Sequence, residues 1–112
     1  MTMTNTAASP SRPKTMLVMK SITVAASPER AFHVFTQEFG SWWPLATHHL
    51  QKVDAATAIM EPFVGGRWFE RGVDGSECNW GRVLAWEPPG RVLLAWEINA
   101  DWQPDVNVQT EV

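Results

Sequence analysis

The stretch from Asp74 to Trp96, DGSECNWGRVLAWEPPGRVLLAW, limits the fold more than any other part of the chain. It contains two turn signals, Asp74-Gly75 and Pro88-Pro89-Gly90, between runs in which apolar and polar residues alternate. An Asp-Gly pair between such runs is a strong signature of a β-hairpin. We therefore predict an antiparallel meander whose strands span residues 57–60, 67–72, 77–86, 91–98 and 106–112.

The region before this meander predicts one strand and two short helices. Residues 16–24, MLVMKSITV, are rich in β-branched side chains and predict a strand. Ser27 and Pro28 are typical of a helix start, and Phe32, Phe35 and Phe39 follow at helical spacing as an apolar core stripe that Gly40 should end. Residues 41–43 predict a short second helix or turn, cut off by Pro44. The order of elements indicates an α+β fold with one sheet.

Length and charge narrow the function classes. The 112 residues suit one domain, which we place at residues 15–112, after a tail at 1–14 that we expect to be disordered. A net charge of −3 argues against a nucleic-acid partner. The sequence has no apolar run long enough for a membrane span, and its single cysteine is Cys78. Residues 1–15 lack the apolar stretch of a secretory signal, so we do not expect them to act as one. These features predict a cytoplasmic protein.

The seven tryptophans raise the question of whether they fill a core or line a hollow. A two-residue turn at Asp74-Gly75 predicts Trp68 opposite Gly81, Phe69 opposite Trp80, and Arg71 opposite Cys78. A four-residue second turn, 87–90, predicts Trp86 opposite Arg91 and Gly81 opposite Trp96. The solvent face would then carry Arg67, Phe69, Arg71, Trp80, Arg82, Leu84, Trp86, Arg91, Leu93 and Glu97.

On the other face, the small residues Gly81 and Ala85 between Trp68 and Trp96 predict a concave surface that a helix, a ligand or both must cover. Trp42 and Trp43 are candidates for the mouth of this cavity, although they equally suit a contact that fastens the helices to the sheet. The predicted ligand-binding residues on this face are Trp68, Glu70, Asn79, Val83, Ala85, Val92, Leu94 and Trp96.

No complete catalytic set is visible. Glu70 on the cavity face suits a general acid or base, but a hydrogen-bonded structural carboxylate is the favoured interpretation. His48 and His49 are adjacent loop residues without the spacing of a metal site, and Cys78 is interpreted as a structural thiol because no histidine supports it. Gly65-Gly66 lacks the pattern of a phosphate loop. We predict no catalytic residue, no metal site and no cofactor.

Two segments resemble the SRPBCC (START-like) superfamily, in particular its branch of activator-of-heat-shock-protein-ATPase homologues. They are ITVAASPERAFHVFTQEFGSWWP and PFVGGRWFERGVDGSECNWGRVLAWEPPGRVLLAW. The resemblance implies a helix-grip fold, in which a curved antiparallel sheet wraps around a long C-terminal helix and leaves an apolar cavity. This chain ends before that helix and the last strands, so the expected domain is C-terminally incomplete.

The resemblance implies three functions. The first is binding of a small apolar or aromatic ligand without catalysis. The alternatives are a co-chaperone-like interaction with a protein partner and, third, a polyketide cyclase or aromatase type of enzyme. An incomplete domain would leave its sheet face open, so a second copy or a protein partner is expected to cover it.

Overall fold

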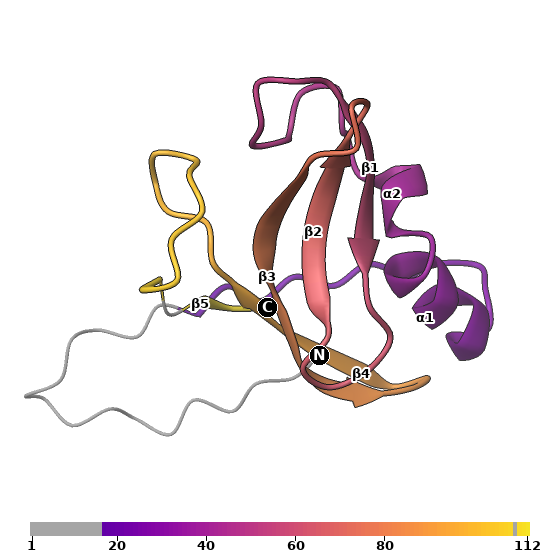
Figure 1. The fold of residues 1–112 in the computed structure, drawn as a ribbon. Helices are drawn as coiled ribbons and strands as arrows, with labels where there is room; N and C mark the ends of the chain where they lie inside the picture. Colours follow the sequence, from indigo (N-terminus) through magenta and orange to yellow (C-terminus); the bar gives the residue numbers. More distant parts are fainter. Residues whose placement is uncertain (1–16, 109) are drawn as a thin grey trace, which may run out of the picture.

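The predicted meander forms a five-stranded antiparallel sheet whose strands lie in sequence order (Figure 1). A computed structural model describes residues 17–108 and 110–112; the tail predicted at residues 1–14 lies outside this range. The strands are β1 (Ala55–Met60), β2 (Arg67–Gly72), β3 (Glu77–Glu87), β4 (Arg91–Trp96) and β5 (Thr110–Glu111). The first four match the prediction closely, whereas β5 is much shorter than the strand predicted at 106–112.

Two helices cover one face of the sheet, which we call the helix face. The first helix, α1 (Pro28–Thr36), begins as predicted, because the Ser27 Oγ accepts a hydrogen bond from the Arg30 amide at 3.1 Å. The second, α2 (Phe39–Trp42), contains Gly40, so the prediction that Gly40 ends the first helix is wrong. A side chain at Gly40 would approach the Ala58 carbonyl oxygen to 3.0 Å, so the glycine permits close packing of α2 on β1.

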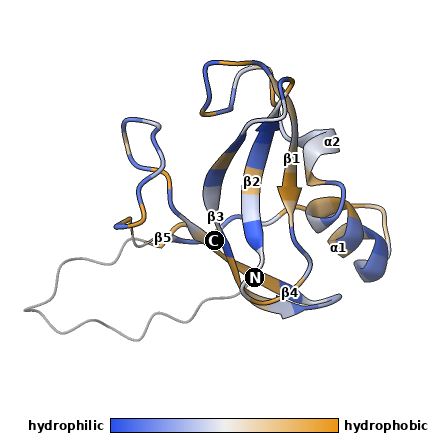
Figure 2. Cartoon of the chain, in the orientation of Figure 1, coloured by the Kyte–Doolittle hydropathy of each residue, from blue (hydrophilic) through white to orange (hydrophobic). Residues whose placement is uncertain are grey.

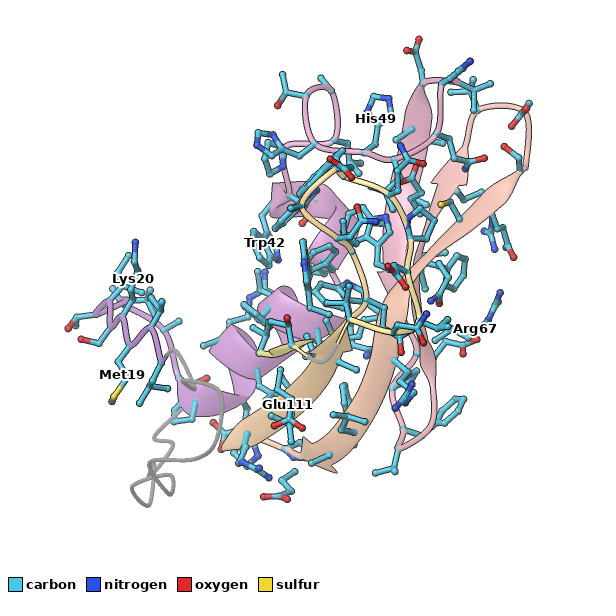
Figure 3. The ribbon with its side chains drawn as sticks, turned by 90° about the vertical axis from the view of Figure 1, so that its left-hand side faces the viewer. Met19, Lys20, Trp42, His49, Arg67 and Glu111 are labelled. Carbon is cyan, nitrogen blue, oxygen red and sulfur yellow. The ribbon has the colours of Figure 1, made fainter. Side chains whose placement is uncertain are left out.

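The strand predicted at residues 16–24 is absent from the described part, residues 17–24. This segment is extended but pairs with no strand, and its apolar side chains are exposed, Ile22 by 87%. Figure 3 shows Met19 and Lys20 standing away from the sheet. The prediction is wrong because strand propensity reflects packing against neighbouring strands, and this segment has none in the described structure.

Strand β3 contains two irregularities, which change the predicted register. Opposite β2, the pairing shifts between Trp68 and Phe69, which leaves Trp80 as an extra residue on β3. Opposite β4, it shifts between Val83 and Ala85, which leaves Leu84 as a second extra residue. Each is a β-bulge, and a bulge bends the strand and changes which face the following side chains meet.

The central pairs are nevertheless as predicted, because each bulge compensates for a one-residue error in the predicted length of the adjacent turn. Trp68 pairs with Gly81, and Gly81 pairs with Trp96. Near the first turn, Phe69 pairs with Asn79 and Glu70 with Cys78, so the predicted pairs Phe69–Trp80 and Arg71–Cys78 are wrong. At the second turn Glu87 pairs with Arg91, so the predicted Trp86–Arg91 pair is wrong and the turn is one residue shorter than expected.

The two faces of the sheet differ in chemistry. The core on the helix face contains Phe39, Ala58, Met60, Trp68, Trp80, Val83, Leu94 and Ile98. On the outer face, the Arg67 guanidinium lies 4.0 Å from the Phe69 ring centroid, and Glu77 bridges Arg67 and Arg71 at 3.0 and 2.9 Å. Trp42 and Arg67 mark these opposite faces in Figure 3. In Figure 2 the hydrophobic end of β1 contrasts with the largely hydrophilic colouring of β2. In the described part of the chain, no helix has the length and apolar character of a membrane span.

Candidate aromatic binding site

The helix face carries a continuous group of aromatic rings, which we call the aromatic cluster. Its centre is Phe39, whose ring stacks on Trp43 at 5.2 Å between centroids and meets Trp68 and Trp80 edge to face at 5.6 and 5.8 Å. Such geometries are the favoured ones for aromatic pairs. The cluster consists of Phe39, Trp42, Trp43, Trp68, Trp80, Trp96 and Trp102.

The cluster runs from the core to the surface. Trp68 and Trp80 are buried, Trp43 and Trp96 are half-buried, and Trp42 and Trp102 are 41% and 36% exposed. The Trp96 ring connects the two ends, at 5.5 Å from Trp68 and 6.0 Å from Trp102. The indoles therefore build the core at one end and present rings to solvent at the other.

Glu70 lies beneath this cluster as a buried carboxylate. Its Oε1 accepts hydrogen bonds from the Leu50 amide at 2.5 Å and from Trp80 Nε1 at 2.8 Å, and its Oε2 accepts one from the Gln51 amide at 3.1 Å. Three donors satisfy a carboxylate that has no exposed surface. Glu70 is therefore a hydrogen-bonded carboxylate, as the favoured interpretation expected, but it lies fully buried and ties the loop after α2 to the sheet.

Two indole N–H groups hold the loops around the exposed end. Trp43 Nε1 donates to the His48 carbonyl at 2.8 Å, and Trp102 Nε1 donates to the His49 carbonyl at 3.1 Å. The second bond joins loops that are far apart in sequence. Trp102 has φ of 60°, the left-handed region that bulky residues rarely adopt. No group of three or more metal-ligating side chains lies within residues 17–108 and 110–112.

A groove of about 340 Å³ lies away from the cluster, between α1 and the β3–β4 turn. Its apolar part is built by Phe32 and Trp86, whose rings meet edge to face at 5.0 Å, together with Pro88 and Pro89. The predicted hollow over Trp68, Val83 and Leu94 is filled instead, because these side chains are at most 3% exposed. The expectation that this face lies open is therefore wrong for these residues.

A sequence profile describing activator of Hsp90 ATPase homolog 1-like proteins matches residues 25–112. The chain belongs to this family. The match starts just before α1 and covers every helix and strand described above. The predicted family is thereby confirmed. The single antiparallel sheet with two short helices described above is consistent with the predicted α+β helix-grip type of fold.

One solved relative adds chemical information. The present chain is 46% identical in sequence to this relative, an anthrahydroquino-gamma-pyrone synthase, Txn09, whose structure was solved complexed with SUM. The similarity covers 80% of this chain and 57% of that one, with a TM-score of 0.52. The chain thus spans a little over half the length of this relative. A search of functionally curated proteins gave no match.

In the present chain, most of the residues predicted to line the site lie together on the helix face. Trp68, Val83, Leu94 and Glu70 are buried on the helix face, and Val92 and Trp96 pack against the core from its rim. The predicted place of Asn79 is wrong: its side chain donates to Glu97 Oε1 at 3.1 Å on the outer face. Ala85 pairs with Leu93 and alternates with the core-packed Trp86, which places Ala85 on the outer face as well. Trp43 meets the sheet at Trp80 and Trp96, with 5.4 and 6.5 Å between ring centroids, whereas Trp42 packs on Phe35 and Phe39 before and within α2.

Sequence reasoning missed Trp80, Phe39 and Trp102 as members of this site. Trp80 was assigned to the outer face because an alternating pattern carries no sign of a bulge. Trp102 joins the cluster through a long-range contact that only the folded chain reveals. Phe39 was predicted as core, but its central place among the indoles depends on the break between α1 and α2. Phe35, expected in the same core stripe, is exposed.

Cys78 is a half-buried thiol on β3. Partial burial, followed by the nearby charge of Glu70, raises the pKa of the Cys78 thiol above its ordinary value. A raised pKa lowers the fraction of reactive thiolate at neutral pH. This agrees with the interpretation that the thiol is not a nucleophile.

Proposed function

We propose that this domain binds a flat, polycyclic aromatic ligand at the exposed end of the aromatic cluster. The observation that carries the proposal is the unbroken path of rings from the buried Trp80 through Trp96 to the exposed Trp102, at 6.4 and 6.0 Å between centroids. Exposed indoles offer broad faces on which a planar ring system can stack. Their positions are fixed from below by the core and by the hydrogen bonds of the two loops.

The solved relative supports the ligand class. Its name describes an anthrahydroquinone-type product, which is a fused aromatic ring system bearing oxygen. On the basis of the 46% sequence identity, we extend a preference for such ring systems to the present chain. The proposed ligand is thereby narrowed from any apolar or aromatic molecule to fused aromatic ring systems that bear oxygen.

The test is calorimetric titration of the protein with anthraquinone-2-sulfonate, a soluble three-ring probe. The wild-type protein is expected to bind it saturably, and Trp102→Ala is expected to weaken binding about tenfold by removing one stacking face. Trp86→Ala is the control, because this ring contacts Phe32 near the separate groove. Absence of saturable binding by the wild type at millimolar probe would overturn the proposal.

A second candidate function is ring formation on the same ligand class, and the 46% identity to a synthase is the observation that favours it. The relative's name includes a γ-pyrone, which is an oxygen-containing six-membered ring, so the substrate class would be a phenolic polycyclic aromatic and the product its pyrone. Chromatography would follow its formation; a rate equal to that in buffer would exclude this activity for the 112-residue chain.

A further inference from the structure

One buried polar atom of the aromatic cluster is unlike the others. Trp68 is 3% exposed, and its Nε1 has no hydrogen-bond partner among the described residues. Four other indoles do have acceptors for this group: Val34 O for Trp42, His48 O for Trp43, Glu70 Oε1 for Trp80 and His49 O for Trp102. The cluster therefore holds two buried indoles, and only one of them, Trp80, has an acceptor for its N–H.

Such an atom needs an explanation. A buried N–H without an acceptor keeps the full cost of losing water, and folded proteins contain few of them. The indole nitrogen is a donor only, so its missing partner must carry a lone pair. Glu70 is the buried carboxylate beneath the cluster, and its oxygens already accept from Trp80, Leu50 and Gln51.

The position of Trp68 links this donor to the proposed ligand site. Its ring lies 5.5 Å from that of Trp96, which is half-buried and 6.0 Å from the exposed Trp102. Trp68 is therefore one ring below the surface of the cluster. Opposite it, Gly81 contributes no side chain, and the place of a Cβ there would be 3.5 Å from Trp68 Cε3.

We propose that Trp68 Nε1–H donates a hydrogen bond to a ring oxygen of the aromatic ligand. Trp68 then determines specificity: the site prefers quinones and related oxygenated polycyclic aromatics over hydrocarbons of the same shape. This inference rests on the proposed function.

Two matched probes test the inference: anthraquinone-2-sulfonate and anthracene-2-sulfonate, which share size and charge but differ in the two ring oxygens. Calorimetry is expected to show about tenfold tighter binding of the quinone by the wild type. Trp68→Phe removes the donor but retains an aromatic ring, so it should bind both probes equally. Trp86→Phe, outside the aromatic cluster, should keep the preference.

A second measurement does not depend on a variant that folds well. With ¹⁵N-labelled tryptophan, the anthraquinone probe should move one indole N–H signal downfield, and the anthracene probe should not. The signal is assigned to Trp68 in the wild-type protein, by nuclear Overhauser effects between the indole N–H and the other protons of that ring. Equal affinity of the wild type for both probes, with no such shift, overturns the role of Trp68 and leaves the ligand site standing. Binding of neither probe overturns the proposed function itself.

Discussion

Two segments of this chain have similar composition, but one forms a buried strand and the other pairs with no strand. Residues 17–24, LVMKSITV, and strand β4, RVLLAW, are both short, apolar and suited to a strand. Strand β4 lies between β3 and β5, and its Leu94 and Ala95 side chains are buried. In the first segment, Val18 and Ile22 are exposed and the backbone joins no sheet.

The difference shows that a strand is defined by its neighbours more than by its own residues. β4 receives a partner because the short turn at 88–90 returns the chain directly onto β3. The first segment leads into α1, so no turn brings a neighbouring strand to it. Pairing, burial and stability therefore depend on connectivity, and composition only permits them.

The largest effect is expected where β3 and β4 approach most closely. A methyl group on Gly81 would overlap the Ala95 carbonyl oxygen, and neither backbone can move away without breaking the ladder. Gly81→Ala should destabilise the fold by about 4 kcal/mol or more, measured by urea unfolding followed by far-UV circular dichroism. Gly90→Ala is the control, because its nearest atom would be 3.8 Å away. Equal stabilities of the two variants would contradict the close approach.

A second pair of substitutions compares the two segments' environments directly. Ile98, 4% exposed, packs in the core, whereas Ile22 is 87% exposed. Ile98→Ala should cost about 2–5 kcal/mol, and Ile22→Ala should change the unfolding free energy by less than about 0.5 kcal/mol. Urea unfolding of both variants measures this difference. A large loss with Ile22→Ala would mean that residues 17–24 pack against something in solution.

A third substitution examines how a loop without strand partners becomes ordered. Glu70→Gln replaces one acceptor oxygen by an NH₂ group, which cannot accept from the Leu50 or Gln51 amide. We expect a loss of about 2 kcal/mol and faster hydrogen exchange of these two amides, approaching that of residues 17–24. The exposed Glu87→Gln is the matched control. Unchanged exchange at residues 50 and 51 would show that Glu70 does not hold the loop.

The smallest effect concerns the outer face. Hydrogen bonds from Arg71 and then Arg67 hold the pKa of the Glu77 carboxyl below its ordinary value. A lowered folded-state pKa stabilises the fold above the ordinary glutamate pKa of about 4.3, and this contribution disappears as the pH falls through the folded value. Glu77→Gln should therefore flatten the decline of the melting temperature between about pH 5 and pH 3. An unchanged slope would mean that these ion pairs contribute nothing.

The sequence was sufficient for the two hairpins, for the start of α1 and for the central pairs of the sheet. Asp74-Gly75 and Pro88-Pro89-Gly90 located both hairpins, and Ser27 located the start of α1. It was insufficient for the faces of β3, because Trp80 and Leu84 are extra residues that no alternation pattern reveals. Trp80 therefore appeared to face solvent, although it is among the most deeply buried side chains.

The same limit applied to the site. Glu70 was recognised as a polar group on the helix face, but its three donors come partly from a loop some twenty residues earlier in the chain. Trp102 was not selected at all, because its contact with Trp96 and its bond to the His49 carbonyl depend on how two loops fold over the sheet. Contacts of this kind follow from the three-dimensional path of the chain.

The aromatic cluster also has an optical consequence. Six of the seven indoles are linked by neighbouring ring centroids 5.4 to 6.5 Å apart, and Trp86 lies outside this set. At such separations, light absorbed by one indole passes rapidly to the next, so the six rings emit as one coupled chromophore. A single quinone stacked on Trp102 would then also quench the emission of the buried Trp80. Binding of one ligand molecule would therefore remove most of the tryptophan fluorescence of the protein.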